Sequence, residues 1–422
     1  MNALRLLKNP MRVREPDQTL PLLADGYRWL PAQWEQTDGP MVRTRLMGRP
    51  AVAVRGPEAV RFFYEEPRIE RHDALPGPVL STLFGHGAVH TLDGRDHQVR
   101  KAMFVDLLKD PDRVEALAST VGAAWDTAAE QWTDGRRVVL FDESARLLTR
   151  AVCRWAGLPL DASRVDDVTR DLVAMVDGFA TAGPRHIRAR RARRRAEQGL
   201  MRLVTRIRTG ERKADPGSVL DAVVHHQGAD GLLIDTHTTA VELLNILRPT
   251  VAISWFVAFA GHALHEWPDQ KRLLREGGEE YARAFAHEVR RHYPFAPFVA
   301  GVAQEELHHR GEPIEAGTLV LLDLYGHDHD AELWVRPDDF DPGRFTGRTP
   351  ERDELIPQGG GDASAGHRCP GEDITVRLLG LLSLRLARLE YRMPAQDLRI
   401  PLERIPTRPK SGVVLGDVRY GD

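Results

Sequence analysis

The stretch Pro357-Gln-Gly-Gly-Gly-Asp-Ala-Ser-Ala-Gly-His-Arg-Cys369-Pro-Gly-Glu372 places a single cysteine in a glycine-dense loop. A helical pattern over 372–386 follows it directly. Glycines allow backbone N–H groups to approach a side chain closely, so we expect such groups near the sulfur. The positive N-terminal end of the following helix also favours a thiolate. The loop therefore predicts that Cys369 binds iron through its sulfur.

The composition is that of a globular protein with a sizeable core. The chain has 422 residues, 42% of them apolar, and a net charge of -3, which gives no overall attraction to nucleic acid or acidic membranes. Its two cysteines, Cys153 and Cys369, indicate a cytoplasmic protein without a disulfide framework. The N-terminal segment lacks the apolar run of a signal peptide, and no uninterrupted apolar stretch reaches the roughly 18–20 residues that span a bilayer. We expect a soluble protein with no membrane insertion.

Hydrophobic periodicity indicates a mainly α protein with small β-sheets. Alternating residues predict strands at 41–47 and 51–55, joined by a turn at 48–50. A helical period dominates from about 97 to 290, and a strand pattern returns at 318–322. The longest helix is predicted over 235–265, with a capping box formed by Thr239 and Glu242. Since no composition shift marks a boundary, we expect one domain over 1–422.

Two polar clusters invite other functions. Nine arginines lie between Arg185 and Arg206, which suggests either a nucleic-acid or anionic-surface patch or a solvated helix face. Aromatic residues are not interleaved with them, so the solvated face is favoured. The histidine pairs 225–226 and 308–309 lack further ligands at metal-binding spacing, because neighbouring side chains point apart. We interpret them as exposed or structural histidines.

Four motifs in order resemble those of the cytochrome P450 family. Cys369-Pro-Gly371, preceded by His367, resembles the proximal haem loop, and Glu288-Val-Arg-Arg291 resembles the ExxR pair of that family. The segment Phe340-Asp-Pro-Gly-Arg344-Phe345 is similar to the segment whose arginine joins this pair. The segment 93–101, with His97, Arg100 and Lys101, resembles the helix that holds a haem propionate.

This resemblance implies the cytochrome P450 fold, with a single haem-binding domain and haem b as the cofactor. It implies that Cys369 is the axial metal ligand. The implied cofactor-binding residues are Cys369, His97, Arg100, Lys101 and His367. The implied structural residues are Glu288, Arg291 and Arg344.

The central helix departs from the usual family pattern. Most members carry an acid–threonine pair there, whereas this chain has Arg248-Pro249. Proline inside a helix removes a backbone hydrogen bond, at a cost of about 3 kcal/mol, and kinks the axis. Arg248 lies in an otherwise apolar run and cannot shed its charge, so burial requires an anion. A bound substrate carboxylate, an internal acid or a side chain that reaches the surface would each meet this need.

Arg248-Pro249 together with the long glycine-rich loop resembles the bacterial fatty-acid peroxygenase and decarboxylase branch of the family. The resemblance implies hydrogen peroxide as oxidant and catalytic roles for Arg248, Pro249 and His90. It implies substrate contacts from Arg248, Phe84, Phe295, Phe298, Phe179 and Ala252, although simple core packing also explains each aromatic residue. In this branch, members with a histidine at the position of His90 tend to add oxidative decarboxylation to hydroxylation. The alternative interpretation of His90 is a structural histidine that is hydrogen-bonded in the interior.

The expected reaction is hydrogen-peroxide-dependent oxidation of fatty acids to 2- or 3-hydroxy fatty acids and terminal alkenes, without a redox partner protein. The alternative enzyme is an NAD(P)H- and redox-partner-dependent monooxygenase of carboxylic acids. A haem carrier, or a binding protein that uses the arginine run, represents a different class of function.

Overall fold

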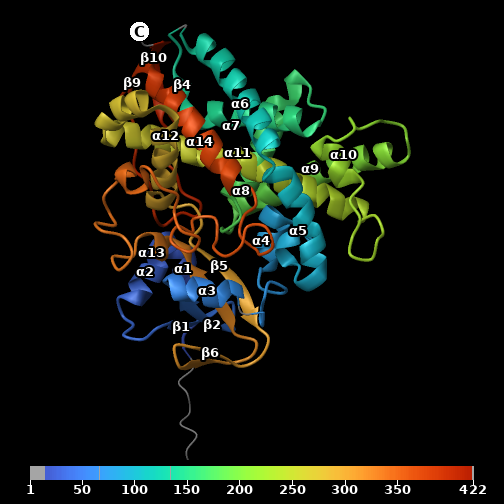
Figure 1. The fold of residues 1–422 in the computed structure, drawn as a ribbon, viewed down its shortest axis with the longest axis vertical. Helices are drawn as coiled ribbons and strands as arrows, with labels where there is room; N and C mark the ends of the chain where they lie inside the picture. The colour runs from blue at the N-terminus through green and yellow to red at the C-terminus, as the bar shows by residue number, and fades with distance from the viewer. Residues whose placement is uncertain (1–14, 66, 134, 421–422) are drawn as a thin grey trace, which may run out of the picture.

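The computed structural model of the protein describes residues 15–65, 67–133 and 135–420. It is mainly α with small sheets in one domain, which confirms the predicted fold class (Figure 1). The long helices are α5 (Gly94–Leu108), α6 (Pro111–Trp132), α7 (Leu140–Ala156), α8 (Val165–Asp177), α9 (Pro184–Arg208), α11 (Thr236–Glu266), α12 (Asp269–His292) and α14 (Glu372–Arg388). The shorter helices are α1 (Thr19–Asp25), α2 (Trp29–Trp34), α3 (Pro57–Glu65), α4 (Gly77–Val79), α10 (Val219–Val224) and α13 (Leu324–Asp328). Single turns of 3-10 or π-helix are η1 (Gly26–Arg28), η2 (Leu80–Phe84), η3 (Val89–Thr91), η4 (Ala162–Arg164) and η5 (Pro342–Phe345).

The main sheet lies at one end of the long axis of the molecule, and the strand pair β9–β10 lies at the other (Figure 1). Its strand order is β1 (Val42–Leu46), β2 (Arg49–Val54), β8 (Leu319–Asp323), β5 (Phe298–Ala303) and β3 (Ile69–Glu70). Only β2 and β8 pair in parallel within it. The smaller sheets are β4 (Val138–Val139), β10 (Val414–Tyr420) and β9 (Leu389–Arg392), and β6 (Leu307–His309) with β7 (Glu312–Ile314). The strands predicted near 41–47, 51–55 and 318–322 are confirmed.

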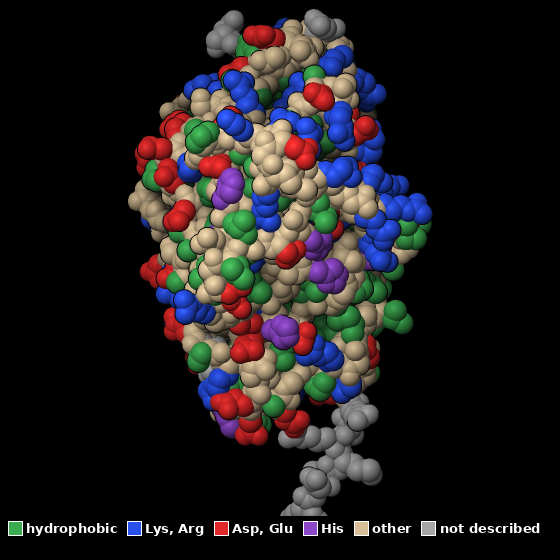
Figure 2. Space-filling view, turned by 90° about the vertical axis from the view of Figure 1, so that its right-hand side faces the viewer, with side chains coloured by type: hydrophobic (Ala, Val, Ile, Leu, Met, Phe, Trp, Pro, Cys, Tyr) green, Lys and Arg blue, Asp and Glu red, His purple; other side chains and the backbone are tan. Residues whose placement is uncertain are grey.

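The arginine run lies on α9, on the side of the molecule seen in Figure 2, where Lys and Arg side chains form a dense group. Arg190, Arg191 and Arg194 are exposed, as a solvated face requires. Arg193 does not follow this prediction. It is 2% exposed and contacts the segment around Leu83, because its position on the helix points inward.

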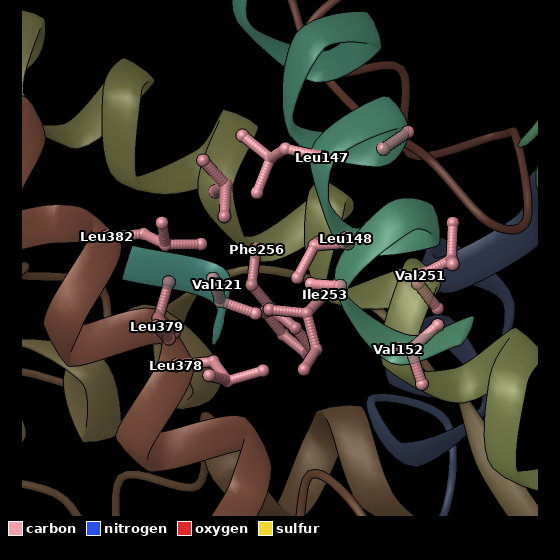
Figure 3. Packing of buried hydrophobic residues seen from close by; sticks show 14 of the residues in the cluster. Val121, Leu147, Leu148, Val152, Val251, Ile253, Phe256, Leu378, Leu379 and Leu382 are labelled. Atoms are coloured by element: carbon pink, nitrogen blue, oxygen red, sulfur yellow. The ribbon is translucent and has the colours of Figure 1, made fainter. Parts of the chain in front are cut away.

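Helix α11 forms the centre of the core and packs against α7, α8, α9, α12 and α14. Figure 3 shows part of this packing, where Ile253 and Phe256 of α11 meet Leu148 of α7 and Leu378 of α14. By length and composition α11 would be able to cross a membrane, but 94% of its most apolar window is buried inside the molecule. Its apolar character therefore belongs to a core helix.

The predicted capping box at the start of α11 is wrong. The N-cap is Asp235, whose side chain accepts a hydrogen bond from Thr238 N at 3.0 Å. Thr239 lies inside the helix, and Glu242 is fully buried and pairs with Arg100 of α5. Glu242 thus balances a buried charge from another helix instead of capping its own. Pro249 stands inside α11, which continues through it as one helix.

Buried histidines make the fold sensitive to acid, and His327 of α13 is a clear case. Its side chain is fully buried, and this burial lowers its pKa to about 4. In the unfolded chain the pKa is about 6.5, so below that pH only the unfolded state gains the proton. The stability contribution is therefore complete above about pH 6.5 and is lost as the pH falls toward 4.

The free energy of unfolding should fall when the pH is lowered from 7 to 5. We expect this fall to be about 2 kcal/mol smaller in His327→Gln than in the wild type, because the variant lacks the buried imidazole. Urea unfolding at the two pH values measures this difference. His308→Gln, at a side chain that is 58% exposed, is the control and should follow the wild type. The same pH dependence in His327→Gln and the wild type would contradict the prediction.

Candidate active site

Cys369 lies in the loop that leads into α14, and only part of the glycine content of this loop serves the sulfur. The Gly371 N–H hydrogen-bonds to the thiol. Gly359, Gly360 and Gly361 instead pack against α3, where a Cβ on Gly360 would lie 2.4 Å from Val60 Cγ1. The expected backbone N–H group near the sulfur is thus present at Gly371, whereas Gly359, Gly360 and Gly361 serve another purpose. Most of them are needed for close packing.

The surroundings of the sulfur suit a metal ligand. Gln358 Nε2 lies 3.6 Å from Cys369 Sγ, a contact that the sequence reasoning missed although the residue is in the same loop. Burial raises the pKa of the Cys369 thiol, while the Gly371 N–H, Lys101 and Arg290 act in the opposite direction. The helix end alone therefore does not produce the predicted thiolate. A bound cation supplies the charge that a buried thiolate needs.

Two histidines stack beside the cysteine loop. The rings of His97 of α5 and His367 lie 3.9 Å apart, and His367 Nε2 lies 3.6 Å from Asp93 Oδ1. Asp93 also accepts hydrogen bonds from two backbone N–H groups, those of Arg71 and His72. Burial opposes the charged form of Asp93, but the His367 contact and these N–H groups lower its pKa to about 2. The histidine pair is thus tied to an ionised carboxylate.

Two cations accompany these histidines. Lys101 Nζ donates a hydrogen bond to Arg368 O at 2.5 Å, and burial lowers the Lys101 pKa to about 8. Arg71 is 7% exposed, and its Nη1 has no hydrogen-bond partner among the described residues. The sequence reasoning missed Arg71, because no motif sets it apart from the other arginines of the chain. The charges of Lys101 and Arg71 both act on His97 and His367, and an unpaired buried guanidinium N–H in this environment fits a ligand that carries carboxylates.

Arg100 of α5 contacts Glu242 of α11. Its Nη1 donates to Glu242 Oε1 at 2.7 Å, and this oxygen also accepts from Val89 N at 2.8 Å. Asn245 Nδ2 donates to the second Glu242 oxygen at 3.0 Å. Burial raises the pKa of Glu242, but these three donors favour its charged form. Arg100 therefore has a protein carboxylate as one partner, while its Nε has no partner among the described residues, and its contact with a cofactor stays a prediction.

Arg248 of α11 is buried, with 6% exposure, and lacks a carboxylate partner in the part of the chain that the structure describes. Its Nη2 donates to Asn245 Oδ1 at 3.1 Å, and its Nε has no partner there. Burial lowers the pKa of Arg248 to about 9; the charge of Arg193 also lowers it, and that of Cys369 raises it. Arg248 and the cysteine therefore share one electrostatic environment. Ala252 lies one turn further along the same helix and is buried.

Phe84 and His90 lie next to Arg248. The Phe84 ring is 4.3 Å from the His90 ring and 5.6 Å from the Arg248 guanidinium carbon. Burial and the charge of Arg248 keep the pKa of His90 well below its usual value, so the imidazole is neutral at physiological pH. His90 Nδ1 is buried and has no partner within the described ranges. A neutral imidazole with a free nitrogen can still exchange a hydrogen bond with a ligand.

The other predicted aromatic residues occupy two regions. Phe295 lies 4.9 Å from Phe256 of α11, and Phe179 packs against the same core. Phe298 belongs to a separate cluster around Trp29, with a ring distance of 6.3 Å. The structure thus groups Phe84, Phe179 and Phe295 with the core of α11, and it does not bring Phe298 into that group.

The three predicted structural residues meet behind the cysteine loop. Arg291 binds both carboxylate oxygens of Glu288, at 2.7 and 2.8 Å, and both side chains are fully buried. Arg344 Nε lies 3.6 Å from Glu288 Oε1. The neighbouring Arg290 was missed; it contacts Glu372, which also binds Arg368 next to Cys369. These pairs connect α12 and α14 to the loop.

Haem fits this set of donors. The charge of Lys101 acts on a thiol that needs a cation, and the charges of Lys101 and Arg71 both act on His97. A thiol and cationic donors suit an iron ion and the carboxylates of a porphyrin. Arg248, His90 and Phe84 form a second group within electrostatic reach of the sulfur. The arrangement can therefore hold a haem through Cys369 and a carboxylate through Arg248.

Comparisons with known proteins agree with this arrangement. The model of the cytochrome P450 family matches residues 279–415. The chain is 29% identical over 209 residues to cytochrome P450 137 of Mycobacterium tuberculosis, a match that spans 48% of this chain and 43% of that protein. The chain thus spans less than half the length of this curated relative.

Two solved structures are similar over almost the whole chain. Cytochrome P450SP alpha in complex with (R)-ibuprofen has a TM-score of 0.92 and 39% identity, and the match covers 96% of this chain and 100% of that one. A variant of cytochrome P450 OleT in complex with arachidonic acid has a TM-score of 0.92 and 34% identity, with 96% and 97% covered.

Proposed function

Since the chain belongs to the cytochrome P450 family, we propose that it is a fatty-acid peroxygenase, which oxidises fatty acids with hydrogen peroxide at a haem b iron bound to Cys369. When bound, the haem supplies the cleavage of the peroxide O–O bond and the oxidation of a C–H bond, with the thiolate as electron donor. Residues of this chain bind the substrate and support the proton transfers.

The observation that carries the proposal is the unpaired charge of Arg248. Two other buried arginines nearby, Arg100 and Arg193, each have a glutamate partner. Arg248 has only the neutral amide of Asn245, so a carboxylate that enters the site would complete a charge-assisted pair in a buried environment. Both similar structures described above hold a carboxylic acid, which supports this ligand class.

The bound carboxylate itself can act as the acid–base group. In this chain Arg248-Pro249 stands in place of the acid–threonine pair, and Glu242 is already engaged by Arg100. A substrate carboxylate held by Arg248 can accept a proton from hydrogen peroxide and return it to the departing oxygen as water forms. His90, which is neutral and has a free nitrogen, can hydrogen-bond to the same carboxylate.

Anchoring the carboxylate favours oxidation close to it, at C2 or C3. In hydroxylation one fatty acid and one hydrogen peroxide give one hydroxy acid and one water. In decarboxylation one fatty acid and one hydrogen peroxide give one terminal alkene, one carbon dioxide and two waters. Both balances are complete without NAD(P)H, so a redox partner protein is not required. The two free thiols, Cys153 and Cys369, are consistent with action in the cytoplasm.

Purified protein, one saturated fatty acid and hydrogen peroxide test the proposal, with products identified by mass spectrometry. Hydroxy acids or alkenes under these conditions support it. Turnover only with NAD(P)H and a reductase would instead identify a redox-partner-dependent monooxygenase of carboxylic acids. No oxidation of any fatty acid under either condition would exclude both.

We expect Cys369→Ser to lose the absorbance band that thiolate-bound haem gives on reduction with carbon monoxide, because a serine oxygen does not replace the sulfur donor. Cys153→Ser is the matched control, since Cys153 is buried in the helical core and the variant should keep the band. A full band in Cys369→Ser would assign the iron ligand to another residue.

We expect Arg248→Leu to bind fatty acids roughly 10- to 100-fold more weakly, because a hydrogen bond to a charged group contributes about 1.5–3 kcal/mol. Haem content should not change. Titration of the haem spectrum with fatty acid measures the affinity, and Arg194→Leu, at an exposed position, is the control. Unchanged affinity and peroxide-driven turnover on a free acid would refute the assignment of Arg248.

We expect His90→Gln to lower the ratio of alkene to hydroxy acid by more than it lowers total turnover. Glutamine can hydrogen-bond to the carboxylate but cannot transfer a proton at neutral pH. Gas chromatography of the products from one saturated acid gives both quantities. An unchanged ratio with lower turnover would mean that His90 only packs or orients the acid. A wild type that forms no alkene would identify a plain hydroxylase.

A further inference from the structure

The segment 83–90 carries two of the residues assigned to the site, Phe84 and His90. It runs from the end of η2 to η3, and it turns at Gly85 and Gly87, whose φ angles are 90° and 77°. Glycine-rich turns of this kind do not hold one conformation by themselves. The position of both rings therefore depends on contacts from other elements.

At the N-terminal end of the segment the contact comes from Arg193 of α9. Its Nη1 donates to Leu83 O at 2.6 Å, and its Nη2 donates to Phe84 O at 3.0 Å. Its Nε donates to Glu197 Oε1 at 2.6 Å, which neutralises the charge. Arg193 is 2% exposed, so these bonds form in a buried environment, where an unpaired group would be costly.

The sequence of the segment is adapted to this contact. A Cβ on Gly85 would lie 2.1 Å from Arg193 Nη2, closer than any real contact. Glycine at this position therefore admits the guanidinium to the two carbonyls as well as allowing the positive φ.

At the C-terminal end the contact comes from α11. Glu242 accepts from Val89 N at 2.8 Å and pairs with Arg100 of α5 at 2.7 Å. Two buried arginine–glutamate pairs, one within α9 and one between α5 and α11, thus hold the two ends of the segment. Phe84 is at the first contact and His90 directly follows the second, and their rings are 4.3 Å apart.

We infer that Arg193 is a positioning residue that sets where a bound acid is oxidised, because it holds the Leu83 and Phe84 carbonyls and so fixes the Phe84 ring against His90 and Arg248. This inference rests on the proposed function. Phe84 lies 5.6 Å from the Arg248 guanidinium, so a shift of its backbone changes the space next to the carboxylate. The carbons next to the carboxylate, C2 and C3, occupy that space. The carbon that lies nearer to the haem iron is oxidised, so the position of the ring determines the products.

The test compares Arg193→Met, which keeps an unbranched apolar stem without the donors, with Arg194→Met, the exposed neighbour on the same helix. Arg193→Lys is a second variant, which keeps the charge but replaces the planar fork of three nitrogens with a single nitrogen on a shorter side chain. Hydrogen exchange of the amides in 83–90 is measured on each purified protein. The distribution of 2-hydroxy acid, 3-hydroxy acid and alkene is measured with one saturated acid and the oxidant system that supports wild-type turnover.

We expect the amides of 83–90 to exchange roughly tenfold faster or more in Arg193→Met, with a changed product distribution, because hydrogen bonds to a charged group are lost. Arg193→Lys should lie between this variant and the wild type, and Arg194→Met should match the wild type. Faster exchange with an unchanged product distribution would overturn the inference, since Arg193 would then only support the fold. Unchanged exchange would overturn it as well. If the wild type oxidises no fatty acid with any oxidant system, the proposed function fails, and the inference fails with it.

Discussion

The structure is organised around a buried positive charge that the described part of the protein does not neutralise. Arg248 lies in the middle of the most buried helix, and its guanidinium keeps its charge at physiological pH even though burial lowers its pKa to about 9. The Asn245 amide oxygen and the face of the Phe84 ring stabilise the cation in part, and neither carries a formal charge. Among the described residues no carboxylate completes this balance, and this supports the proposal that the ligand is a carboxylic acid.

Helix α11 places the groups that surround this charge on one face. Glu242, Asn245, Arg248 and Ala252 follow one another at intervals of three, three and four residues, which is the spacing of neighbours on one side of a helix. On this face Glu242 is already paired with Arg100, and Asn245 offers only a neutral amide. Arg248 lies between Asn245 and the small side chain of Ala252 and has no charged partner among the described residues. Ala252 itself is buried and belongs to the same core cluster as the apolar residues of the helix.

On the other side of the site, paired charges hold the cysteine loop rigid. Arg291 with Glu288 ties α12 to the segment around Arg344, and Arg290 with Glu372 ties α12 to the start of α14. Each of these groups has a partner, so this network is structural, in contrast to Arg248. A buried pair of this kind costs several kcal/mol to break, since it leaves one charge unpaired. The sulfur thus remains at a fixed position relative to the helices.

The sequence by itself determined the features whose chemistry is local. The Cys369 loop, the Glu288–Arg291 spacing and the charge of Arg248 within an apolar run are all readable from neighbouring residues, because a helix or a tight loop fixes their geometry. Only the tertiary structure decided which partner each remaining charge would have. Arg100 meets Glu242, 142 positions away, and Arg193 meets the Leu83 carbonyl, 110 positions away, although the sequence suggested a cofactor for the first and solvent for the second. The N–H groups of an arginine can donate to a carboxylate, a carbonyl or water. The choice depends on which element packs against it, and that information is absent from its sequence neighbours.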